Sequence, residues 1–190
     1  NPNNNQFVIC GNSENGTTGK GEGGQHDKLF EIFLGFDDER LRANLTSFGS
    51  DGWTVNWDVV PALSLPYFYL ALGGLNVNVG TFNQAVTPNT GNQSVTGVDF
   101  SPIGTMFLTA NQDQTRSGLV DDFMRISIGS ATSSSNEGST WTGDRGNVAT
   151  TLSSRGMHLV NQCFSCVSEG TPTVTENSIA DFVSNDGSGF

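Results

Sequence analysis

The stretch Ser50–Gly74 constrains the fold of this chain more than any other. It opens with SDG, a turn signal in which Asp bonds its own backbone and Gly permits a positive φ. Trp53–Trp57 then alternates large apolar and polar residues, the period-2 pattern of a half-buried strand. After two prolines, Tyr67–Leu72 reads YFYLAL, is apolar on both faces and ends at two glycines. We expect a hairpin-like pair with one amphipathic strand and one fully buried strand.

This pattern also predicts a core. We expect the most buried side chains of the N-terminal half to include Trp53, Val55, Trp57, Tyr67, Tyr69 and Leu70.

The opening of this stretch recurs later in the chain. Ala43–Trp53 reads ANLTSFGSDGW and Ala180–Phe190 reads ADFVSNDGSGF, an offset of 190 − 53 = 137 residues. The second copy stops at its aromatic residue, where the first continues into its apolar strands. We therefore expect one complete and one incomplete repeat unit, with a first β-unit over residues 1–89 and a second over 90–190.

Composition favours an all-β chain. Only 14% of residues are charged and 24 of 190 are Gly, which suits short strands joined by tight turns. The 13 Phe and 3 Trp at alternating positions favour a packed core over disorder. The expected fold is a β-sandwich or jelly-roll-like architecture of roughly ten to twelve strands without helices.

Other segments carry strand or loop patterns. Gly11–Gly24 is glycine-rich and predicts a long flexible loop or a tight glycine-rich connection, and Ser130–Gly146 predicts a long loop or a weak hairpin. The remaining expected strands are Gln6–Cys10, Asp27–Gly35, Arg40–Phe48, Leu75–Phe82, Ser94–Val98, Gly104–Ala110, Phe123–Ile128, Val148–Leu152, Met157–Cys166 and Thr171–Thr175.

The charge of the chain excludes some partners. A net charge of −11 and only 8 scattered Lys and Arg argue against nucleic-acid binding. No run approaches the roughly 20 apolar residues of a membrane span. The chain opens NPNNN, without Met or a signal peptide, so we expect a mature, processed or partial chain with an extracellular or virion-surface location.

Three cysteines are too few for a disulfide scaffold. Cys163 and Cys166 form a C-x-x-C pattern, but the second Cys or His pair of a zinc site is missing. We expect structural roles, with a disulfide from Cys10 to either Cys163 or Cys166.

No pattern indicates an enzyme. His26 and His158 lie outside any catalytic motif, and the chain has no nucleophile elbow or phosphate loop. Asp37–Glu39 and Asn185–Gly187 offer oxygen ligands for Ca²⁺ but lack EF-hand spacing, so no cofactor and no metal site are expected. Three sequons make glycosylation candidates of Asn15, Asn44 and Asn92.

The segments FGSDGWTVNW, YFYLALGG, VGTF and TGNQSVTGVDFSPIGTMFL resemble a tandem β-repeat of bacteriophage tail-fibre and virion structural proteins and their metagenomic relatives. The resemblance covers Ala43–Leu108 clearly and extends in order to Phe190. It implies a β-sandwich-like fibre or particle component without enzymatic activity.

The expected function is structural. An incomplete sheet exposes unpaired backbone groups, and a neighbouring copy can fill it by β-strand complementation. Repeating such a contact head-to-tail gives a filament of one kind of chain. We expect Phe7, Val8 and Ile9 to belong to the donor strand behind a polar lead, and Phe182 and Phe190 to line the slot that accepts it. The alternative is a carbohydrate-binding sandwich that stacks sugars on Trp53, Trp57 and Trp141.

Overall fold

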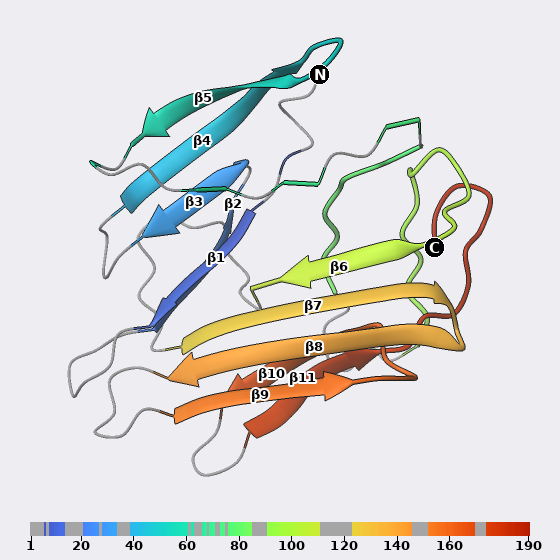
Figure 1. Cartoon of the computed structure of the whole chain (residues 1–190). Helices are drawn as coiled ribbons and strands as arrows, with labels where there is room; N and C mark the ends of the chain where they lie inside the picture. Colours follow the sequence, from blue (N-terminus) through green and yellow to red (C-terminus); the bar gives the residue numbers. More distant parts are fainter. Residues whose placement is uncertain are drawn as a thin grey trace.

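The structure is a computed structural model of the chain. It describes residues 6, 8–13, 21–26, 28–33, 39–60, 62, 66–67, 69–70, 73–74, 76–84, 91–110, 123–145, 152–169 and 174–190. These residues form an all-β, sandwich-like fold with antiparallel sheets and no helix in the described ranges (Figure 1). The expected fold class is confirmed.

The N-terminal part contains a hairpin and a three-stranded sheet. Strand β1 (Val8–Ser13) pairs with β2 (Gly21–His26). The sheet has the order β3 (Phe30–Phe33), β4 (Glu39–Phe48), β5 (Trp53–Val59). The SDG turn joins β4 to β5, with the Gly49 N–H donating to the Gly52 carbonyl at 2.7 Å.

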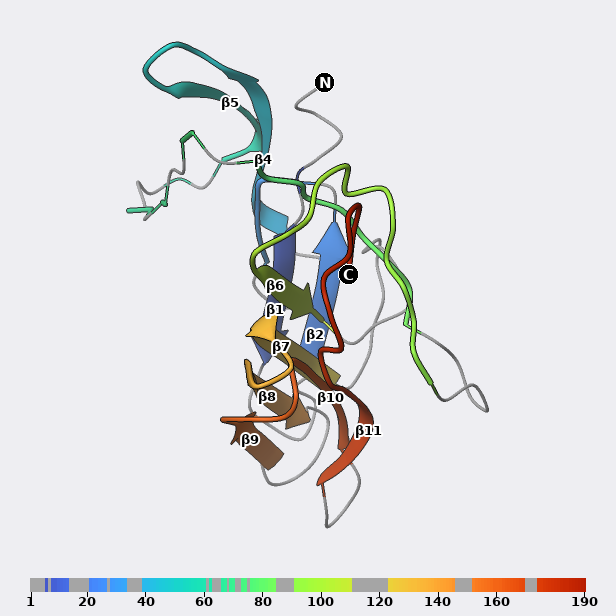
Figure 2. The same ribbon diagram turned by 90° about the vertical axis from the view of Figure 1, so that its right-hand side faces the viewer.

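The C-terminal part is a two-layer sandwich. One layer is a four-stranded sheet in the order β6 (Thr105–Thr109), β7 (Phe123–Ser133), β8 (Asn136–Arg145), β9 (Leu152–His158). The other is the pair β10 (Phe164–Glu169) and β11 (Val174–Ala180). Figure 2 shows the pair lying beside the sheet as a second layer, and β10 contacts both β7 and β8.

Small residues let the two layers approach closely. The backbone of Cys163 passes so near Gly129 that a Cβ at that position would overlap the Cys163 carbonyl group. The Ser139 hydroxyl on β8 likewise donates to the Ser165 hydroxyl on β10 at 3.2 Å. Where the two layers meet, the inner face of β7 and β8 therefore carries Ser127, Gly129, Ala131 and Ser139 rather than large apolar residues.

Aromatic rings fill the sandwich beside this contact. The buried cluster contains Phe107, Ala131, Cys163 and Phe182, with Phe164 and Phe190 packed against it. The C-terminal residue Phe190 contacts Phe107 at a centroid distance of 5.5 Å. Its backbone pairs with Val95 through hydrogen bonds in both directions, of 2.7 and 3.1 Å. The C-terminal segment is thus held inside its own sandwich.

The sequence repeat has a structural counterpart. The turn bond from Gly49 to Gly52 recurs from the Asp186 N–H to the Gly189 carbonyl at 2.9 Å, and 186 − 49 = 137. Phe30 pairs with Ala43 in one copy, and Phe164 pairs with Ala180 in the other. Strands β3 and β4 therefore correspond to β10 and β11. In the described residues, no strand corresponding to β5 pairs with β11.

Most apolar alternations correspond to strands. Arg40–Phe48 and Phe123–Ile128 lie in β4 and β7, and β6 covers Gly104–Ala110 apart from its two end residues. Strand β3 confirms the strand prediction for the central part of Asp27–Gly35. For Ser130–Gly146 the two expected alternatives were a long loop and a weak hairpin. The structure shows the hairpin, because β7 and β8 pair with each other.

Several boundaries were wrong. Residues 11–13 and 21–24 belong to β1 and β2 rather than to a glycine-rich loop. Met157–Cys166 is not one strand, because β9 ends at His158 and the chain crosses to the other layer before β10. The described part of Leu75–Phe82 contains no strand, and Ser94–Val98 joins the C-terminal segment without belonging to a strand element.

The expected pair of core strands is also wrong. Strand β5 pairs with β4, while the described residues Tyr67, Tyr69 and Leu70 lie outside any strand. Trp53, Trp57, Tyr69 and Leu70 are exposed, and the core under this sheet is Leu41, Ala43 and Leu45 on β4. The physical reason is that a sheet face is buried only where a second layer covers it, and this face has only partial cover.

Candidate self-association surfaces

An exposed aromatic surface covers one side of the β3–β4–β5 sheet. We call it the aromatic face; it consists of Phe30, Trp53, Trp57, Tyr67 and Tyr69. Trp57 stacks on Phe30 at a centroid distance of 5.9 Å, and Tyr67 lies 4.8 Å from the same Phe30 ring. Tyr69 meets Trp53 edge-on at 5.5 Å.

The aromatic face is ordered but open. Trp57 is 42% exposed and Tyr69 is 72% exposed, although both are held by ring contacts. Large aromatic side chains that remain half open on a sheet are typical of interaction sites.

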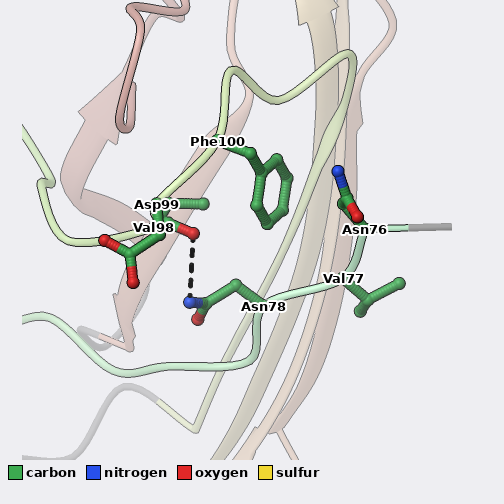
Figure 3. A pocket seen from close by; sticks show the side chains of 6 residues that line it. All are labelled: Asn76, Val77, Asn78, Val98, Asp99 and Phe100. Carbon is green, nitrogen blue, oxygen red and sulfur yellow. Dashed lines mark hydrogen bonds between the residues drawn. The ribbon is translucent and has the colours of Figure 1, made fainter.

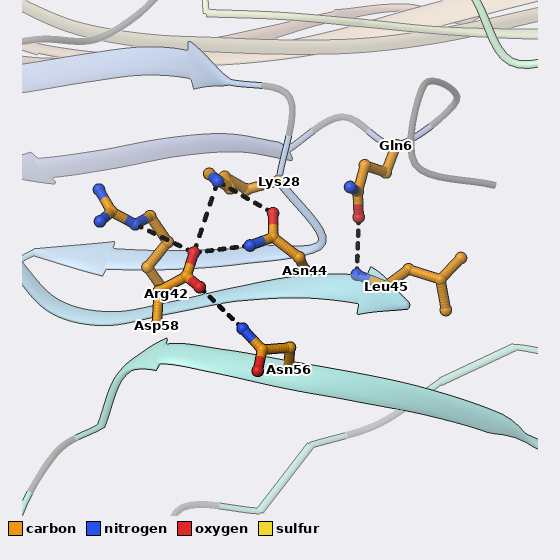
Figure 4. A network of polar contacts seen from close by, with 7 residues as sticks. All are labelled: Gln6, Lys28, Arg42, Asn44, Leu45, Asn56 and Asp58. Atoms are coloured by element: carbon orange, nitrogen blue, oxygen red, sulfur yellow. Dashed lines mark hydrogen bonds and ion pairs between the residues drawn. The ribbon is translucent and has the colours of Figure 1, made fainter. Parts of the chain in front are cut away.

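The opposite side of the same sheet carries a polar network (Figure 4). The Asp58 carboxylate accepts hydrogen bonds from Asn44 at 2.6 Å and Asn56 at 2.9 Å. Lys28 and Arg42 form ion pairs with it at 3.4 and 3.5 Å. Only one side of this sheet is therefore apolar, which gives it the polarity of a sandwich layer.

A second exposed apolar surface lies on the outer face of the four-stranded sheet. We call it the aliphatic row; it consists of Met106, Leu108, Ile128 and Met157. Leu108 pairs with Ile128, Ile128 with Thr140, and Thr140 with Met157, so these side chains follow one another across four strands. Met106 is 69% exposed and Met157 is 65% exposed. The row thus forms an apolar band on the outer face of the sheet.

The expected assembly residues lie in two places. Val8 and Ile9 are half-buried in β1, hydrogen-bonded to β2 of their own chain, and Phe7 lies outside the described residues. Phe182 is buried and Phe190 half-buried in the sandwich core. The structure therefore does not bring the two groups together within one chain, and their roles in assembly stay predictions.

Two side chains that the sequence did not single out support the repeat. The Leu45 N–H donates to Gln6 Oε1 at 2.8 Å, and at the corresponding position the Phe182 N–H donates to Glu137 Oε2 at 2.7 Å. Each side chain satisfies a buried backbone donor of the layer next to it. The two residues differ in type and lie 137 − 6 = 131 residues apart, which hides the correspondence in the sequence.

Glu137 also affects the neighbouring cysteine. Burial, together with the neighbouring Glu137 carboxylate, raises the pKa of the Cys163 thiol to about 12. Cys163 is a free thiol that donates to the Ala180 carbonyl at 3.3 Å. The expected disulfide from Cys10 to Cys163 is therefore wrong for this chain, and the side chains of Cys10 and Cys166 lie outside the described residues.

We expect Glu137→Gln to keep most of the stability and Glu137→Ala to lose about 1–3 kcal/mol, because alanine leaves the buried Phe182 N–H without an acceptor. Gln6 shows that an amide oxygen serves at the corresponding position. Denaturant titration of both variants checks this. Equal losses in the two variants would contradict it. In Glu137→Gln the pKa of Cys163 should also fall, which thiol alkylation as a function of pH measures.

A shallow pocket lies between residues 76–78 and 98–100 (Figure 3). Asn78 Nδ2 donates to the Val98 carbonyl across it at 3.4 Å. Its lining is two amides, one carboxylate and apolar side chains: Asn76, Val77, Asn78, Val98, Asp99 and Phe100. This lining includes no nucleophile next to a base, so the pocket gives no basis for a catalytic assignment.

The other candidate residues have varied surroundings. Asn92 is exposed, whereas the Asn44 amide is engaged with Asp58 and Lys28, and Asn15 lies outside the described residues. The Asp186 carboxylate accepts the Ser188 N–H at 2.7 Å in its own turn. Asp37 and Asp38 are not among the described residues, and the rest of the described chain contains no group of three potential metal ligands.

Within the described ranges, no helix is long and apolar enough to cross a membrane. Comparisons with protein-family models, curated proteins and solved structures found no match.

Proposed function

We propose that this chain is a non-enzymatic structural subunit of an extracellular filament or virion fibre, which polymerises head-to-tail by β-strand complementation. The observation that carries the proposal is the correspondence between β4 and β11. Strand β4 has β3 on one edge and β5 on the other, whereas within the described residues β11 pairs with β10 alone. The free edge of β11 presents backbone groups that an added strand satisfies.

The resemblance to tandem β-repeats of phage fibre and virion proteins supports the same proposal. So do the two exposed apolar surfaces, because such surfaces on a soluble chain are typical of protein contacts. The donor that we propose is Asn1–Cys10 of a neighbouring copy, which exchanges the pairing of Val8–Cys10 with its own β2 for the edge of β11. The polymer consists of copies of this chain.

The direct experiment is electron microscopy of the purified chain, together with sedimentation velocity over a range of concentrations. Filaments of repeating subunits are the expected result, and a chain that stays monomeric at high concentration would overturn the proposal. For the donor, an excess of the peptide Asn1–Cys10 should shorten the filaments, while a scrambled peptide should not. Competition by peptide is preferable to deletion, because deletion also removes the Gln6 acceptor of Leu45.

A carbohydrate-binding module is the second candidate. It is favoured by the exposure of Trp53 and Trp57 on one face of β5, since exposed indole rings offer apolar faces for stacking. Trp141 offers little surface for stacking on a sugar, because its ring lies against Gly156 and is half-buried. Changes in tryptophan fluorescence on titration with soluble oligosaccharides, lost in Trp53→Ala, would support this candidate.

A further inference from the structure

An amine, a carboxamide and a carboxylate meet on the polar side of the β3–β4–β5 sheet (Figure 4). Lys28 Nζ, just before β3, donates to Asn44 Oδ1 on β4 at 2.9 Å. Asn44 Nδ2 donates to Asp58 Oδ2 on β5 at 2.6 Å, and Lys28 Nζ lies 3.4 Å from the same oxygen. The amine is therefore beside the amide carbonyl group, and one carboxylate oxygen is within reach of both nitrogens.

The surroundings hold these three groups in place. Asn56 Nδ2 donates to the other carboxylate oxygen, Asp58 Oδ1, at 2.9 Å, and Arg42 Nε lies 3.5 Å from Oδ2. The Lys28 side chain is 19% exposed and the Asp58 side chain 25%, so both are largely shielded, yet a small leaving molecule can reach solvent. Groups held in contact in this way react much faster than the same groups free in solution, because the cost of bringing them together is already met.

The strand arrangement does not require this amine and amide. In the second copy of the repeat, Gln162 takes the place of Lys28, and Asp181 takes the place of Asn44. Strands β10 and β11 nevertheless pair as β3 and β4 do. The contact between Lys28 and Asn44 is thus a feature of one copy only, and the fold alone does not explain it.

We propose that Lys28 and Asn44 become joined by an isopeptide bond. The Asp58 carboxylate accepts a proton from the Lys28 ammonium group, and the neutral amine attacks Asn44 Cγ. The Nζ–Cγ bond forms and the Cγ–Nδ2 bond breaks. The lysine nitrogen gives up two protons in all, which Asp58 passes to the departing NH₂ group. That group leaves as ammonium and Asp58 ends unchanged, so the reaction needs no oxidant and no second reactant.

The bond ties β4 to the segment that leads into β3, an edge strand of its sheet. A cross-link of this kind stabilises a fold by restricting the unfolded chain, as a disulfide does. The inference goes beyond the proposed filament, because a single chain contains all three reacting groups.

The intact mass of the purified chain tests the proposal. The wild type should weigh less than its sequence by one ammonia molecule, and its digest should contain a branched peptide that joins Lys28 to Asn44. Lys28→Arg keeps the positive charge but removes the nucleophile, and Asp58→Asn removes the proton carrier, so both variants should keep their full mass. Lys20→Arg is the matched control, because Lys20 is the only other lysine of the sequence, and it should lose ammonia like the wild type.

The branched peptide in the wild type decides the matter whether or not the variants fold. A wild type that keeps its full mass after prolonged incubation would refute the bond. Loss of ammonia without the branched peptide would refute it too, since cyclisation of an asparagine onto its own backbone also releases ammonia. A glycan on Asn44 would show that the amide is used differently and has the same consequence. A branched peptide that persists in Asp58→Asn would overturn the role of Asp58. None of these results bears on filament formation, which electron microscopy of the same material measures separately.

Discussion

Replacing Gly129 with alanine is expected to destabilise the chain by about 3 kcal/mol or more. The added Cβ would overlap the carbonyl group of Cys163, and a backbone group cannot turn away as the end of a flexible side chain does. Relief requires the layers of the C-terminal sandwich to move apart. That movement also weakens the hydrogen bond between Ser139 and Ser165.

The measurement is the free energy of unfolding from denaturant titration at concentrations too low for assembly. Gly73→Ala is the matched control, because nothing lies within 4 Å of a Cβ at that position, and its change should stay within about 1 kcal/mol. If Gly129→Ala were as stable as Gly73→Ala, the close approach of β7 to the Cys163 backbone would be refuted.

This contact also explains which strands sequence patterns could predict. Strand β6 has one large inward residue, Phe107, between exposed neighbours, so its alternation is visible in the sequence. The inward positions of β7 and β8 include Ser127, Gly129 and Ser139, because the crossing of β10 leaves no room for larger side chains. A pattern of small and polar residues carries little hydrophobic periodicity, and β8 was accordingly expected only as a loop or weak hairpin.

The misplaced N-terminal core has a different cause. Hydrophobicity indicated correctly that Trp53 and Trp57 share one face of a strand, but burial requires a second layer, which a single-strand pattern cannot reveal. Leu41 and Ala43, which are buried, stand out less in the sequence because they are smaller than tryptophan and lie next to the charged residues Arg40 and Arg42 of the same strand. The exposed aromatic side chains were thus visible in the sequence as apolar residues, but not as a surface.

The repeat was predicted from an alignment of eleven positions, three of them identical, and the structure extends it well beyond them. Similar residue types mark the turn and β4, so the sequence sufficed there. Leu29 and Cys163 differ in type, yet each donates its N–H to the corresponding alanine carbonyl, at 2.9 and 3.0 Å. Backbone hydrogen bonds preserve this correspondence without demanding particular side chains, which explains why the sequence did not reveal it.

Replacing Phe107 with alanine is expected to cost about 3–5 kcal/mol, the usual range for removing a buried phenylalanine ring. The ring joins β6 to the C-terminal segment through an edge contact with Phe190, and it also meets Phe82 edge-on. It belongs to the same buried cluster as Phe182. The cavity would loosen Phe190 and with it the two backbone hydrogen bonds to Val95.

The control is Ile103→Ala, because Ile103 is almost fully exposed and lies nearby in the sequence. It should change the stability by less than about 0.5 kcal/mol. Thermal and denaturant unfolding of both variants checks the difference, and amide hydrogen exchange at Val95 and Phe190 should accelerate in Phe107→Ala alone. Unchanged protection at these two amides would show that the C-terminal segment is held independently of the β6 ring.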